Sequence, residues 1–172
     1  AAIYNPTVAP GNNSIKISGV GGATGTVIAE LYDATPSSSL TDATPRLINV
    51  SVLKHLGSGL TVGFVIGGAT TRAVLIRAIG PTLGAAPFNV PEIVADPQLT
   101  LYSGQTRIAA DDNWGGSTTL GTAFTRVGAF PLPAASRDAA LVVTLQPGSY
   151  TVQVSGVNGS TGVALVEVYE AQ

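Results

Sequence analysis

The sequence predicts an all-β protein, built as an antiparallel sandwich or barrel, and three observations support this. Polar and apolar residues alternate along short runs such as residues 14–18 and 149–154, which is the period of a half-buried strand. Turn residues separate the runs at intervals too short for βαβ units. Glycine accounts for 21 of the 172 residues, well above the ~7% of average usage.

Local signals in the sequence predict strands, one helix and several tight turns along the chain. Strands are predicted for residues 14–18, 26–32, 47–53, 60–66, 73–79, 98–102, 139–145, 149–154 and 163–169. At most one short helix is expected, because only the stretch after Ser117 or Thr118 has a capping residue followed by apolar residues at helical spacing. Asn158-Gly159, Gly21-Gly22 and Gly67-Gly68 each predict a tight hairpin turn, since such turns need positive φ.

Two of these predicted hairpins are copies of one another. When residues 9–35 are aligned with residues 146–172, an offset of 137, 11 of the 27 positions are identical. The identities include Glu30 with Glu167 and Tyr32 with Tyr169, which strand alternation alone does not require. We interpret this as a true internal repeat. The chain therefore holds two copies of its closing hairpin and one copy of everything else.

The repeat suggests a division into three parts. Residues 1–35 form an N-terminal hairpin, residues 36–45 form a linker bounded by Pro36 and Pro45, and residues 46–172 form the β-sandwich domain. The chain starts at Ala1 and contains no Met, so we expect that a leader was removed or that the chain is a fragment.

An isolated two-stranded hairpin is marginally stable in water, so the N-terminal one must dock on something. It could pack on its own domain, pair with the open sheet edge of a neighbouring chain, or belong to a longer tandem array. Docking on a neighbour would be head-to-tail and would build filaments. The expected interface is its apolar face, which consists of Ile15, Ile17, Val27, Ala29 and Leu31.

Composition excludes several classes of function. The chain has no Cys, which removes disulfide scaffolds, thiol nucleophiles and Cys-ligated metals. Its net charge of −2 argues against nucleic acid as a partner, and no apolar run reaches the ~18 residues needed to span a membrane. The single His and the absence of a Gly-x-Ser-x-Gly motif give no sign of a catalytic triad. We therefore expect no enzyme and no catalytic residues.

Several strings together resemble a known family. They are Asp96-Pro97-Gln98-Leu99-Thr100-Leu101-Tyr102, Asp111-Asp112-Asn113-Trp114, Gln146-Pro147-Gly148-Ser149-Tyr150 and Val163-Ala164-Leu165-Val166-Glu167-Val168-Tyr169. This pattern resembles the β-sandwich repeats of large secreted bacterial surface proteins, which are similar to bacterial pre-peptidase C-terminal domains. The resemblance implies a jelly-roll-like sandwich, an extracellular or cell-surface location, and a binding or structural role.

Three candidate sites remain. Asp111, Asp112 and Asn113 offer oxygen ligands in a glycine-bounded loop and form a weak calcium candidate, the one cofactor considered; an Asx turn beside a packed Trp114 is the favoured interpretation. Trp114 could instead stack on a sugar. Glu167 is expected to form a structural ion pair with Arg77 from a central strand.

These observations favour a secreted structural protein that self-associates into an extracellular filament or surface assembly, with the N-terminal hairpin docking on the next subunit. The alternative is an accessory module that binds carbohydrate or cell wall within a larger surface protein.

Overall fold

The computed structural model describes residues 1–41 and 43–171 and divides the chain into two compact units, 1–47 and 48–172. Asp42, inside the predicted linker, and Gln172, the last position of the repeat, lie outside the described residues. The second unit holds all the assigned strands. They are β1 (Asn49–Leu56), β2 (Leu60–Ile66), β3 (Arg72–Ile79), β4 (Pro97–Ser103), β5 (Thr106–Asp111), β6 (Ala139–Leu145), β7 (Gly148–Gly156) and β8 (Gly162–Glu170).

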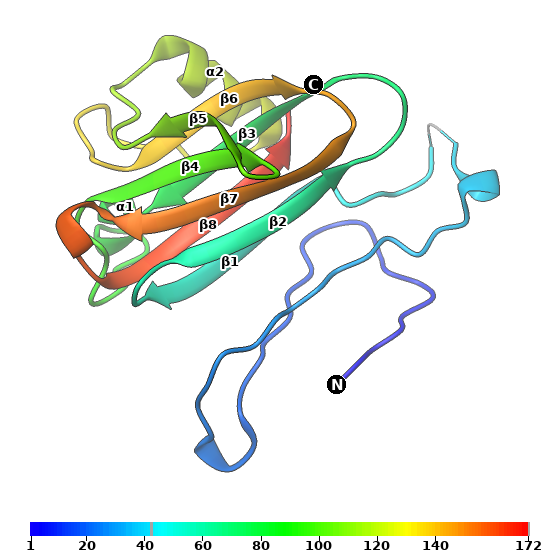
Figure 1. Ribbon diagram of the computed structural model, residues 1–172, viewed down its shortest axis with the longest axis horizontal. Coiled ribbons are helices and arrows are strands. Elements are labelled where there is room, and N and C mark those ends of the chain that lie inside the picture. Colours follow the sequence, from blue (N-terminus) through cyan, green and yellow to red (C-terminus); the bar gives the residue numbers. More distant parts are fainter. Residues whose placement is uncertain (42, 172) are drawn as a thin grey trace. The chain divides into compact units, whose positions relative to one another are not determined.

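The eight strands form two stacked four-stranded antiparallel sheets (Figure 1). One sheet has the order β1-β8-β3-β6 and the other the order β2-β7-β4-β5. Strands that follow one another in sequence lie in opposite sheets, except for β4 and β5, which pair as a hairpin. This alternation is a jelly roll, so the predicted sandwich fold is confirmed.

The hairpin interpretation of the C-terminal turn is wrong. Strands β7 and β8 flank Asn158-Gly159 but do not pair, because β7 lies between β2 and β4 while β8 lies between β1 and β3. The 3-10 turn η3 (Val157–Gly159) therefore crosses from one sheet to the other. We call β7, η3 and β8 together the closing arch. The turn at Gly67-Gly68 also joins strands of different sheets, β2 and β3.

The sheet that contains β3 is covered on both faces. Alternate residues of β3, such as Val74 and Ile76, face the core between the sheets. The residues between them, such as Leu75 and Ile79, face a second core formed with α2 (Thr118–Val127) and neighbouring loops. Burial on both faces explains why this strand is a continuous apolar run interrupted by Arg77.

The predicted helix forms as α2. The Ser117 hydroxyl accepts a hydrogen bond from the Leu120 N–H, and Gly128 ends the helix with φ of 72°. A single helical turn, α1 (Pro81–Gly84), follows β3 and was not predicted. Neither helix in the described part of the chain is long and apolar enough to cross a membrane.

The N-terminal unit contains two 3-10 turns, η1 (Val20–Gly22) and η2 (Ser37–Ser39). No strand is assigned among its described residues, so the predicted hairpin has its turn but no ladder of backbone hydrogen bonds. Residues 14–18 and 26–32 carry the strand pattern, but a strand needs a hydrogen-bonded partner as well as a pattern.

Candidate functional site

The closing arch supplies one inner strand of each sheet, β7 in one and β8 in the other. Its inward side chains are buried in the core between the sheets, with 0% of Val152, 1% of Val154, 0% of Ala164 and 1% of Val166 exposed. Because β7 and β8 each have a strand on both sides, the arch holds both sheets together.

The N-terminal copy, residues 9–34, contains the same turn. Gly21 and Asn158 have φ/ψ of 63°/22° and 54°/28°, and the following glycines have φ of 79° and 75°. Each turn closes with one backbone hydrogen bond, Ala23 N–H to Val20 O at 3.2 Å and Ser160 N–H to Val157 O at 3.1 Å. The repeat thus extends from sequence to backbone conformation.

The two copies differ in what covers them. Ile15, Ile17, Val27 and Leu31 are 70%, 56%, 65% and 52% exposed, and Ala29 is exposed too. Their counterparts at the 137-residue offset are Val152, Val154, Ala164, Val168 and Val166, all buried. The N-terminal copy therefore has the same kind of apolar face as the closing arch, but this face is exposed.

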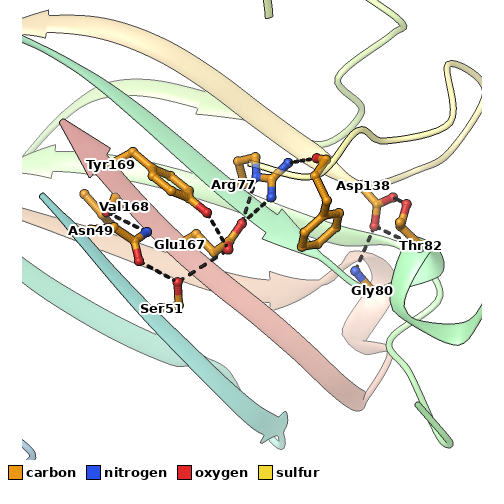
Figure 2. A network of polar contacts seen from close by, with 10 residues as sticks. Asn49, Ser51, Arg77, Gly80, Thr82, Asp138, Glu167, Val168 and Tyr169 are labelled. Atoms are coloured by element: carbon orange, nitrogen blue, oxygen red, sulfur yellow. Dashed lines mark hydrogen bonds and ion pairs between the residues drawn. The ribbon is translucent and has the colours of Figure 1, made fainter. Parts of the chain in front are cut away.

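A buried polar network crosses from β3 to β8 (Figure 2). Arg77 Nε and Nη2 both donate to Glu167 Oε2, at 2.8 and 2.5 Å, and Arg77 Nη1 donates to the Phe130 carbonyl. The structure therefore brings together the two residues expected to pair. Burial and the neighbouring Glu167 carboxylate, to which its hydroxyl donates at 2.8 Å, raise the pKa of Tyr169 to about 12.

Aromatic rings enclose the Arg77 guanidinium. Its central carbon lies 4.5 Å from the Phe130 ring centroid and 4.9 Å from that of Phe124. Arg77 has no exposed surface, so the pair is shielded from any substrate and acts to fix β3 against β8.

Asp138 forms a second buried network that sequence reasoning missed. Its carboxylate accepts hydrogen bonds from the Gly80 N–H at 2.8 Å and from the Thr82 N–H and hydroxyl (Figure 2). It thereby ties the chain before β6 to the turn after β3. The available signal was a Gly-Pro-Thr sequence at the end of a buried strand, which exposes backbone donors that need a partner.

The repeat keeps part of the first network. The Tyr32 hydroxyl donates to Glu30 Oε1 at 3.1 Å, as Tyr169 does to Glu167. The N-terminal copy has this Glu–Tyr pair on its surface, whereas the closing arch has it beside Arg77.

Asp111, the first residue of the calcium candidate, makes a contact within the sandwich. Asp111 Oδ2 accepts from the Ala140 N–H at 2.9 Å, which bridges β5 and β6, and desolvation raises the pKa of its carboxyl. The described residues hold no group of three or more His, Cys, Asp or Glu side chains that could bind a metal. A calcium site at Asp111, Asp112 and Asn113 stays a prediction; a rise in melting temperature with Ca²⁺ that is lost in Asp111→Asn would establish it.

Trp114 is not available as a sugar platform. It is 8% exposed, its ring lies 5.4 Å from that of Phe124, and its Nε1 donates to the Pro133 carbonyl. Its packing therefore follows the favoured interpretation. His55 is an exposed residue of β1.

The fold defines the molecule as a jelly-roll β-sandwich. No family model and no curated protein matches the chain. Among solved structures, the chain is similar to the pre-peptidase C-terminal domain of a collagenase from Bacillus anthracis. The two are 13% identical with a TM-score of 0.41, and the match covers 70% of this chain and 89% of that one.

Proposed function

We propose that the chain is a non-catalytic structural module that self-associates, the N-terminal copy of one chain docking on the sandwich of the next. One observation carries the proposal. The N-terminal copy repeats the sequence and turn geometry of the closing arch, yet it leaves exposed the apolar face that the arch buries.

The energetic reason is the cost of leaving that face in water. Burying a Val, Leu or Ile side chain stabilises a protein by about 1.5–3 kcal/mol, and the N-terminal copy carries several of them. Two strands alone cannot bury such a face, whereas a sandwich can. Docking on a second chain would remove these apolar side chains from water.

The form of the assembly follows from the geometry of such a contact. The docking segment and the accepting sandwich are different surfaces of the chain, so each bound chain offers a new acceptor and a new donor. Contacts of this heterologous kind extend into filaments unless they close into a ring. An extracellular or cell-surface location belongs to the proposal and rests on the resemblance of the sequence to repeats of secreted surface proteins.

The proposal is tested by self-association of the full chain. We expect sedimentation velocity to show species that grow with concentration, and electron micrographs to show elongated particles. The double variant Ile15→Ser, Ile17→Ser should lose this growth. Lys16→Ser is the matched control, because the counterpart of Lys16 is the exposed Gln153. A full chain that stays monomeric at every concentration overturns the proposal, as does a double variant that assembles like the parent chain.

A further inference from the structure

We infer that the N-terminal copy docks by taking the place of a closing arch, entering the sandwich of a second chain between its strands rather than adding to an edge. This inference rests on the proposed self-association and names its binding site. We call the site the closing slot. It is lined by β2 and β4 in one sheet and by β1 and β3 in the other.

Gly25 is a glycine although nothing in the N-terminal copy itself requires one. A Cβ at Gly162 would lie 2.6 Å from backbone atoms of Glu92, Ile93 and Val94, so the slot accepts only glycine there. Its counterpart Gly25 has open space around it and no positive φ. The requirement at Gly25 is therefore set by the slot, which an edge contact would not impose.

The second strand of the N-terminal copy ends in the same polar pair as β8. Glu30 and Tyr32 reproduce Glu167 and Tyr169, whose partner Arg77 lies on β3 and has no exposed surface. A strand added to the outer edge of β1 would have both β1 and β8 between itself and β3. Arg77 can meet Glu30 only if the N-terminal copy lies in the slot.

The side chains of the N-terminal copy are close in size to those of the closing arch, but not identical to them. Ile15 and Ile17 replace Val152 and Val154, each with one additional methylene group. Asn13 replaces Tyr150, whose ring stacks 5.6 Å from Phe64 and whose hydroxyl donates to the Gln146 carbonyl. The chain's own arch is consequently the stronger occupant, and the N-terminal copy of a second chain competes with it as the concentration rises.

The connection to the donor chain is also feasible. The end of β8 lies beside the start of β1, where Glu170 N–H donates to the Ile48 carbonyl at 2.9 Å. A donated strand would leave the slot at this corner. Residues 35–47 then span at most about 45 Å when fully extended, which is enough to reach a separate sandwich.

The decisive variant is Gly25→Ala in the full chain. Docking in the slot predicts loss of self-association, because the added Cβ meets the backbone there. Edge addition predicts no change, which would overturn the inference and leave the proposed function standing. Thr24→Ala is the matched control, since its counterpart Thr161 is exposed.

A second comparison uses stability and does not need the parent chain to assemble. Gly162→Ala disfavours the chain's own arch in the slot, and the N-terminal copy should then replace it. We expect the double variant to melt about 10 °C or more below Gly162→Ala, and Gly25→Ala to have a smaller effect in the parent chain, whose own arch fills the slot. Equal melting of the double variant and Gly162→Ala overturns the inference. A Gly162→Ala chain that is rescued but monomeric supports the slot and contradicts self-association.

Cross-linking locates the strand directly, because the chain contains no Cys. Val166 lies opposite Ala78 on β3 and Val52 on β1, so Ala29 takes that register in the slot. In the Gly162→Ala background, Ala29→Cys should form a disulfide with Ala78→Cys between two chains. Cross-linking to Val52→Cys without any to Ala78→Cys would place the segment at the edge and overturn the inference.

Discussion

Arg77 and Glu167 lie directly opposite one another on neighbouring strands, β3 and β8, and their side chains meet on the face that α2 covers. The pair joins a strand of the closing arch to a strand of the remaining sandwich. The change in the free energy of unfolding when either residue is replaced therefore measures how strongly this pair holds the closing arch in the sandwich.

Removing one member of this pair should be costly. Arg77→Met leaves the Glu167 carboxylate buried without its cation, and we expect a loss of about 3–5 kcal/mol in the free energy of unfolding measured with urea. The comparison is Arg72→Ala, whose ion pair with Glu170 has a 41% exposed arginine and should cost less than about 1 kcal/mol. Similar losses for the two variants would contradict this account of the network.

Alkaline pH should weaken the fold through Tyr169. Its folded-state pKa is raised to about 12, so the unfolded chain releases this proton at lower pH than the folded chain. The contribution is fully present below the ordinary tyrosine pKa of about 10 and is lost as pH rises toward 12. Free energies of unfolding measured from pH 8 upward should fall more steeply for the parent chain than for Tyr169→Phe. Parallel curves would rule out this linkage.

Replacing Asp138 should lower the free energy of unfolding, because its carboxylate is fully buried and accepts hydrogen bonds from Gly80 and Thr82. Asp138→Ala leaves the Gly80 N–H and the Thr82 hydroxyl without their acceptor, at about 1–3 kcal/mol for each buried donor. Asp138→Asn keeps one acceptor oxygen and should lose less. Urea unfolding followed by Trp114 fluorescence measures both, since Trp114 is buried and its backbone N–H donates to the Asp138 backbone carbonyl. An Asn variant less stable than the Ala variant would argue against this ranking.

Acidification should favour the folded state at Asp111, because the pKa of this carboxyl is raised on folding. Desolvation raises the pKa of this carboxyl in the folded state, so its favourable contribution is present at low pH and is lost as pH rises through that pKa. Asp111→Asn removes the ionisation while keeping an acceptor for the Ala140 N–H. We expect the stability of the variant relative to the parent to shrink between pH 7 and pH 4. A difference that stays constant across this range would exclude the titration.

The local sequence pattern predicts where most of the strands lie, but it does not predict which strands pair. Alternation and turn residues located β2, β3 and β6, and the Ser117 cap located α2, because these signals depend on a few adjacent residues. Strand β5 was missed: Arg107 and Ala110 are exposed along it, and its short run lacks clear alternation.

The sequence predicts a hairpin where the structure has an arch, because Asn158-Gly159 specifies a reversal of the chain and not the sheet that each strand enters. The sheet that β8 enters is set by its pairing with β1, which lies more than a hundred residues earlier in the sequence. The Arg77–Glu167 pair was accessible from sequence because Glu167 recurs at Glu30. Asp138 has no such repeat, and its partners are backbone groups that no side-chain pattern reveals.

The order of the two copies along the chain has a consequence for synthesis. Strands β1 to β6 leave the ribosome after the N-terminal copy and before the closing arch. Translation of the last 27 residues, 146–172, takes roughly 1 to 5 s. On the proposed docking in the slot, the sheets lack their own arch during that interval, and the N-terminal copy of a neighbouring chain meets an empty closing slot. Exchange between chains is then favoured during synthesis, before Tyr150 and the rest of β7 compete for the same place.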